Sequence, residues 1–219
     1  MNTHSKRLLA SALFTLLAGG AHAQANTGSL AGWQAFGDAS AAGGAIRLTT
    51  AFLDGGSDQP FNLSGTSAVD IGVIEAAAGL PTYGLDFPEP NYGTEGSLVT
   101  QTFAVPAWTQ FSIMWSFDSV ETVFLDRAFI VINGRVTTLD TTFPNITSTP
   151  FVQTFQTATT VTLALGVIDT GDYLGVSTLT ISDLRLAQLQ IPEIPEPSTY
   201  ALWLGGLAMV GAAARRRRG

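Results

Sequence analysis

The sequence predicts a mainly β protein, a β-sandwich or jelly roll with one short helix, plus an N-terminal signal peptide and a C-terminal transmembrane helix. Three observations lead to this prediction. Short segments rich in Thr, Val, Leu and Phe recur along residues 24–187 between Gly, Asp and Asn turns. Residues 1–23 and residues 198–219 each contain an apolar stretch next to basic residues.

The strands are predicted from hydrophobic periodicity and turn signals. In residues 109–117, TQFSIMWSF, the apolar side chains Phe111, Ile113, Trp115 and Phe117 alternate with Ser112, Met114 and Ser116. This pattern is typical of a half-buried strand. Asn133-Gly134 lies between two apolar runs and predicts a hairpin, because both residues tolerate positive φ. Further strands are expected within residues 45–52, 97–105, 151–157, 160–168 and 176–189.

One helix is expected in residues 67–79, SAVDIGVIEAAAG. Ser67 and Asp70 are spaced as in a capping box, and Gly79 can end the helix. Residues 24–187 then form one body domain, because their number suits a single hydrophobic core.

The N-terminal segment has the three parts of a secretory signal peptide. Lys6 and Arg7 precede the apolar run 8–17, and Ala21-His22-Ala23 forms an A-x-A cleavage site. Signal peptidase is therefore expected to cut after Ala23 and to leave Gln24 as the mature N-terminus. The body is expected to pass through the inner membrane by the secretion machinery.

The C-terminal segment is predicted to be a marginal membrane span. Residues 201–214 contain no charged side chain, so a helix there must be buried in lipid or in protein. Residues 200–214 would extend about 22 Å against a hydrocarbon core of about 30 Å. The basic residues that follow favour the cytoplasmic side and would stop translocation; they are Arg215, Arg216, Arg217 and Arg218. A core helix is the alternative.

A proline-rich linker, residues 188–197, precedes this span. Its triplet Pro195-Glu196-Pro197 disfavours regular helix and keeps the backbone extended. An extended segment beside a membrane suits a protease. The same triplet occurs at Pro88-Glu89-Pro90 without a following span, and there it is expected to be an ordinary loop.

The order of triplet, Ser-Thr, apolar span and terminal arginines resembles the PEP-CTERM sorting signal. The resemblance implies recognition by exosortase, a membrane protease-transferase of bacteria that make exopolysaccharide. It implies that Pro195, Glu196 and Pro197 form the recognition element and that the arginine cluster is the retention signal. The protein would be anchored transiently and then reach the cell surface or a biofilm matrix.

The composition of the body together with the linker, residues 24–197, excludes several classes of function. Residues 24–197 hold four arginines and all seventeen acidic residues, a net charge of −13. A nucleic-acid partner is not expected, because phosphate binding needs a basic surface. The body has no His, Lys or Cys, which excludes Ser-His-Asp and Cys-His catalysis and disulfides. The chemistry that remains uses carboxylates, alone or with calcium.

Calcium is the one candidate ion. Asp residues with Gly neighbours occur in DGGSD, residues 54–58, and in DTGD, residues 169–172. Such loops suit calcium, but Asp and Gly are also the common residues of ordinary turns. Asp38 and Asp183 are predicted as the first pair of ligands to test, because the first and last strands of a jelly roll often lie side by side.

Five aromatic residues could together form a platform that stacks on sugar rings, if they are exposed: Trp33, Tyr83, Tyr92, Trp108 and Tyr173. For Trp33 the alternative is a place in the core. The order of motifs in the body is also similar to jelly-roll carbohydrate-binding modules. We expect a non-enzymatic structural or adhesive role at the cell surface. The alternatives are a carbohydrate-binding module for exopolysaccharide and a glycoside hydrolase that uses two carboxylates.

Overall fold

The computed structural model describes residues 29–53, 56–86, 92–120, 122–140 and 150–190, with positions 202–204, 207, 209 and 215 near the C-terminus. The predicted signal peptide, its cleavage site and both Pro-Glu-Pro triplets lie outside the described residues. Most of the predicted span, residues 198–219, also lies outside them. Within the part of the chain that is described, no helix has the length and hydropathy needed to cross a membrane.

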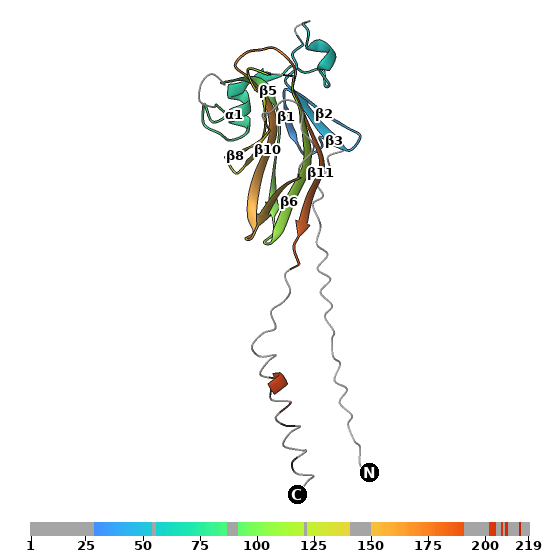
Figure 1. Cartoon of the computed structure of the whole chain (residues 1–219). Coiled ribbons are helices and arrows are strands. Elements are labelled where there is room, and N and C mark those ends of the chain that lie inside the picture. Colours follow the sequence, from blue (N-terminus) through green and yellow to red (C-terminus); the bar gives the residue numbers. More distant parts are fainter. Residues whose placement is uncertain are drawn as a thin grey trace, which may run out of the picture.

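The described strands form two antiparallel sheets that pack face to face (Figure 1). The six-stranded sheet has the order β1-β5-β10-β7-β8, with β4 also paired to β5; the five-stranded sheet has the order β2-β3-β11-β6-β9. The strands are β1 (Gln34–Phe36), β2 (Asp38–Ala42), β3 (Ala45–Thr49), β4 (Val69–Asp70), β5 (Gly93–Val105), β6 (Thr109–Asp118), β7 (Arg127–Ile132), β8 (Arg135–Asp140), β9 (Pro150–Phe155), β10 (Thr159–Thr170) and β11 (Thr178–Gln188). The predicted mainly β sandwich is confirmed.

The main core lies between the two sheets. In β6 the burial alternates along the strand, and Phe111, Ile113, Trp115 and Phe117 are buried. They belong to one cluster with Leu163 and other residues of the six-stranded sheet. The half-buried strand that the alternation predicts is therefore confirmed. The predicted hairpin is also confirmed, since Asn133 and Gly134 both have positive φ between β7 and β8.

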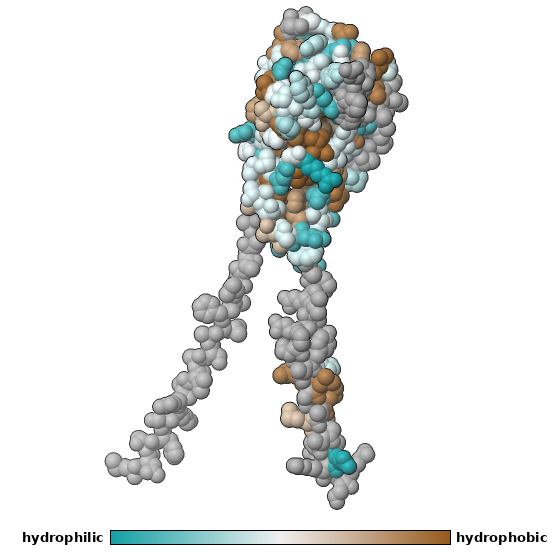
Figure 2. Space-filling view, turned by 90° about the vertical axis from the view of Figure 1, so that its left-hand side faces the viewer, coloured by the Kyte–Doolittle hydropathy of each residue, from teal (hydrophilic) through white to brown (hydrophobic). Residues whose placement is uncertain are grey.

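A second, smaller core covers part of the outer face of the six-stranded sheet. Helix α1 (Ile71–Ala77) and the loop after it place Ile74, Ala78 and Leu85 against Leu98 and Phe129 of the sheet. A short 3-10 helix, η1 (Gln59–Phe61), precedes β4. Figure 2 looks onto the side of the molecule that carries α1 and shows apolar surface interrupted by hydrophilic side chains.

The ends of α1 show which part of the helix prediction is right. The N-cap is Asp70, whose side chain accepts a hydrogen bond from Gly72 N. The predicted start at Ser67 is wrong, because the Ser67 hydroxyl accepts from Leu53 N instead. At the other end, Gly79 has φ +71° and Leu80 N donates to Glu75 O. This is a Schellman motif, so the predicted glycine cap is confirmed.

The sandwich has two distinct ends. Gly93 pairs with Thr170, and Thr178 pairs with Asp118, so the start of β5 and the loop between β10 and β11 share one end. We call it the loop end. Val105 pairs with Thr159, and Gln188 pairs with Thr109, at the opposite end. We call this the tail end, because β11 leads from it to the C-terminal segment (Figure 1).

A buried carboxylate lies near the loop end. Glu95 is 2% exposed and its Oε2 has no hydrogen-bond partner. Burial raises its pKa to about 7; the hydrogen bond from Thr94 opposes this rise, while repulsion from Asp126, Asp58 and Asp172 adds to it. Asp58 and Asp172 belong to the two acidic loops singled out in the sequence, so one carboxylate of each loop lies close enough to Glu95 to raise its pKa.

Glu95 is expected to make stability depend on pH. Its pKa in the folded state is raised from the ordinary value of 4.5 to about 7. The contribution of Glu95 to the free energy of unfolding is therefore fully present below about pH 4.5 and is lost as the pH rises through about 7. We expect Glu95→Gln to melt at a higher temperature than the wild type at about pH 8, with the difference shrinking toward about pH 5. Thermal melts of both proteins across this range provide the measurement. A difference that stays constant with pH would contradict the assignment.

Candidate functional site

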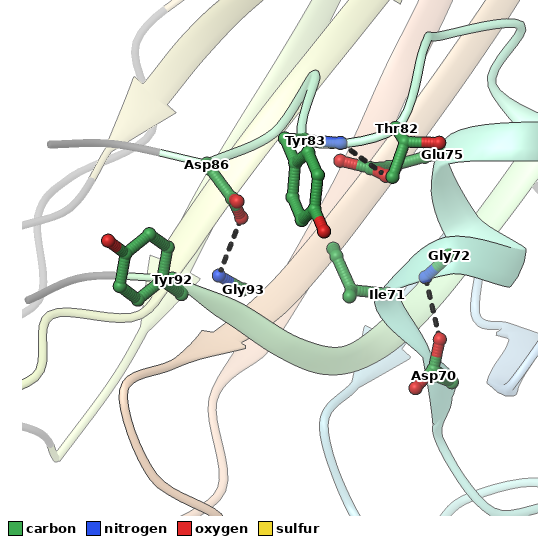
Figure 3. A pocket seen from close by; sticks show the side chains of 9 residues that line it. All are labelled: Asp70, Ile71, Gly72, Glu75, Thr82, Tyr83, Asp86, Tyr92 and Gly93. Carbon is green, nitrogen blue, oxygen red and sulfur yellow. Dashed lines mark hydrogen bonds between the residues drawn. The ribbon is translucent and has the colours of Figure 1, made fainter. Parts of the chain in front are cut away.

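A pocket of about 300 Å³ opens where α1, the loop after it and the start of β5 meet (Figure 3). Three acidic residues and two tyrosines are among its lining residues, and none of the lining residues is basic. The lining consists of Asp70, Ile71, Gly72, Glu75, Thr82, Tyr83, Asp86, Tyr92 and Gly93. The pocket therefore combines aromatic faces with hydrogen-bond acceptors, which is the usual composition of a site for a small polar ligand.

Glu75 joins the helix to the loop that forms one wall of the pocket. Its side chain is buried, and both of its oxygens accept backbone hydrogen bonds: Oε2 from Tyr83 N at 3.0 Å and Oε1 from Leu85 N at 3.0 Å. Loss of either hydrogen bond would leave a backbone amide and a buried carboxylate oxygen without a partner, which costs free energy. Glu75 thus fixes the backbone of the loop at Tyr83.

Tyr83 is held in an unusual conformation. Its φ is +67°, and its side chain is 77% exposed. A left-handed backbone is costly for a residue with a bulky side chain, on the order of 1–2 kcal/mol. Exposure means that burial of the ring in the folded protein does not offset this cost. In Figure 3 the ring stands over the pocket with its hydroxyl toward Ile71. Strain of this kind, kept by surrounding contacts, is common at binding sites.

A second set of contacts ties down the end of the same loop. The side chain of Arg127, on β7, donates from a guanidinium nitrogen to Leu85 O at 2.7 Å. Burial lowers the pKa of Arg127 to about 10, while the negative charge of Asp86 opposes this shift. Asp86 Oδ1 accepts from Gly93 N at 3.2 Å and so connects the loop to β5. Arg127 remains charged at neutral pH and supports the floor beneath the loop.

The structure separates the five predicted aromatic residues. Tyr83 and Tyr92 line the same pocket, and Tyr92 is 46% exposed. Tyr173 lies on the neighbouring loop at the same end, since Gly171 N donates to Tyr92 O. Trp108 lies at the tail end, where its carbonyl accepts from Leu189 N. Trp33 is part of the core between the sheets, so a platform that includes it is wrong.

The predicted calcium pair does not form. Strand β3 lies between β2 and β11, so the expectation that the two strands are neighbours is wrong. Asp38 is fully buried and accepts hydrogen bonds from the Thr49 hydroxyl and from Ser64 N. Asp183 is exposed at a bulge in β11 and forms an ion pair with Arg185 at 3.0 Å. Both carboxylates therefore have separate structural partners.

The other acidic residues that the structure describes also form no metal site. In the ranges that the structure describes, no group of three or more His, Cys, Asp or Glu side chains is placed to hold a metal ion. The residues that sequence reasoning missed are Glu75 and Asp86, which shape the pocket. Glu75 stands among alanines in a helical segment, and its pattern there is that of an ordinary helix former. That Glu75 accepts hydrogen bonds from the Tyr83 and Leu85 amides can be seen only in the folded structure.

Comparisons with known proteins identify the C-terminal segment. Two solved structures are similar to the chain. One is described as "CBM4 structure and function"; it is 16% identical with a TM-score of 0.35, and the match covers 74% of this chain and 97% of that chain. The other is the N-terminal cellulose-binding domain of Cellulomonas fimi β-1,4-glucanase C; it is 15% identical with a TM-score of 0.28, and the match covers 76% of this chain and 94% of that chain. No curated protein matches the chain. Residues 193–218 match the PEP-CTERM protein-sorting motif. The chain thus carries a PEP-CTERM sorting motif, which implies an exported protein that is processed by exosortase.

Proposed function

We propose that the body is a non-catalytic carbohydrate-binding domain, which serves a structural or adhesive role at the cell surface or in the extracellular matrix. The observation that carries this proposal is the exposed ring of Tyr83, held on a backbone with positive φ, in the same pocket as Tyr92. Aromatic rings stack on the apolar faces of sugars, and neighbouring acceptors bind sugar hydroxyls. The pocket offers both kinds of group.

The charges around the pocket favour an uncharged polysaccharide. Asp70, Glu75 and Asp86 are the charged residues of its lining. A uronate or sulfated sugar would meet these carboxylates without a basic partner, so it would be repelled. Neutral sugars carry hydroxyl groups, which can donate to the carboxylate oxygens.

The roles of the carboxylates favour binding over hydrolysis. Each of the three accepts a backbone N–H: Asp70 from Gly72, Glu75 from Tyr83 and Leu85, and Asp86 from Gly93. These bonds hold the walls of the pocket. Glu95, whose pKa is raised, is buried and is not among the residues that line the pocket. A general acid would need to reach the glycosidic oxygen.

Tyr83→Gly separates binding from folding. Glycine adopts φ +67° without steric cost, so we expect the variant to keep or gain stability while its affinity for the polysaccharide falls roughly tenfold or more. Exopolysaccharide purified from the producing bacterium serves as the ligand, with binding measured by calorimetry and stability by thermal melts.

Trp108→Gly is the matched control. Trp108 also has a positive φ, +57°, and an exposed side chain, but it lies at the tail end. Trp108→Gly should bind as the wild type does. Because Trp108 is only 42% exposed, the variant loses buried apolar surface, and the same thermal melts measure the resulting change in stability. Equal loss of affinity in both variants, or no loss in Tyr83→Gly, would rule out the pocket as the binding site.

We also propose that the triplet Pro195-Glu196-Pro197 is the one exosortase reads, while Pro88-Glu89-Pro90 is not read. The first lies next to the apolar segment and the arginines of the sorting motif. A membrane anchor raises the effective concentration of the adjacent triplet at a membrane enzyme. We expect Glu196→Ala to leave the protein in the membrane fraction and Glu89→Ala to be released normally. Fractionation of cells that express each variant, with and without exosortase, measures this. Retention of Glu89→Ala together with release of Glu196→Ala would contradict it.

A further inference from the structure

We propose that Tyr173 and Leu174 form a second subsite beside the pocket, so that the protein binds several consecutive sugar units of one polysaccharide chain. This inference rests on the proposed function of the pocket. It concerns the loop between β10 and β11, residues 171–177, which has no part in forming the pocket wall described above.

The loop is hydrogen-bonded to Tyr92 and to Thr94, at the start of β5. Gly171 N donates to Tyr92 O at 2.8 Å, and the Thr94 hydroxyl donates to Asp172 O at 2.9 Å. Tyr173 is the next residue after Asp172. Its backbone is therefore adjacent to the start of β5, where Tyr92 and Gly93 line the pocket. Exposed aromatic side chains thus continue from Tyr83 and Tyr92 onto this loop.

The loop is held in a defined conformation. Gly171 has φ +83°, and a side chain at this position would collide with the ring of Phe124. The preceding residue, Thr170, bonds through its backbone N to Asp126 Oδ1 at 3.2 Å and through its hydroxyl to Leu125 O at 2.9 Å. Within the loop, Leu174 N donates to Asp172 Oδ1 at 3.1 Å. These contacts fix the backbone on both sides of Tyr173.

The side chains that this ordered loop presents are apolar and exposed. Tyr173 is 65% exposed and Leu174 is 66% exposed. Folding does not bury these side chains, so their contribution to stability is small. A tyrosine on a fixed backbone loses little conformational entropy on binding, which makes it an effective contact for a ligand. The ligand must be long enough to reach from the pocket to the loop, as a polysaccharide chain is.

The test compares ligand length in the wild type and in Tyr173→Ala. The probe is the exopolysaccharide of the producing bacterium, cut by partial hydrolysis into fragments of about two and about six sugar units. We expect the wild type to bind the longer fragment about tenfold more tightly. Tyr173→Ala should bind the short fragment as the wild type does, and it should lose most of the increase in affinity that the longer fragment shows. Because Tyr173 is exposed, the variant should melt at the wild-type temperature.

The other outcomes separate this inference from the proposed function. If the wild type binds neither fragment, the proposed function fails and this inference with it. If the wild type binds both fragments and Tyr173→Ala keeps the full gain with length, the pocket stands and the second subsite is wrong. Equal loss of affinity for both fragments would place Tyr173 within the first subsite and would also overturn the proposal.

Discussion

The buried carboxylate of Glu75 is the interaction on which the pocket end of this sandwich depends. It lies in the last turns of α1 and accepts the amides of Tyr83 and Leu85. The helix is itself fixed by its packing on the outer face of the six-stranded sheet, where Ile74 and Ala78 are buried. The sheet therefore fixes the helix by packing, the helix fixes Glu75, and the hydrogen bonds of Glu75 fix the backbone that carries the exposed ring of Tyr83.

The pocket and the start of the C-terminal segment lie at opposite ends of the sandwich. The pocket and the loop of Tyr173 lie at the loop end, and β11 runs from that end to the tail end before the chain continues to the sorting motif. An eleven-residue strand at about 3.3 Å per residue separates the two ends by roughly 35 Å. A protein attached through its C-terminal segment would hold the proposed binding surface on the side away from the attachment. This arrangement suits a domain that contacts polysaccharide outside the cell.

Local signals explain what could be predicted from sequence. The alternation in residues 109–117, the Asn133-Gly134 turn and the Gly79 cap depend on neighbours close in the chain, and each is confirmed. The sequence predicts one platform of five aromatic residues, but it does not show that Trp33 and Trp108 lie elsewhere. Tyr83 and Tyr92 line one pocket, and the loop of Tyr173 is bonded next to Tyr92, because β5 pairs with β10 and because α1 packs on the sheet. Strand order is a long-range property, and the same limit explains why Asp38 and Asp183 were wrongly paired.

If Glu75 preorganises Tyr83 for binding, Glu75→Gln should loosen the loop and weaken binding together. Glutamine keeps the size of the side chain, but its NH2 group would face one of the two backbone N–H groups that donate hydrogen bonds to Glu75. Hydrogen exchange and calorimetry with purified exopolysaccharide should be measured on the same sample. We expect faster exchange of the Tyr83 or Leu85 amide, unchanged protection of Leu163 in the core, and weaker binding. Wild-type affinity in a variant whose loop amides exchange faster would contradict it.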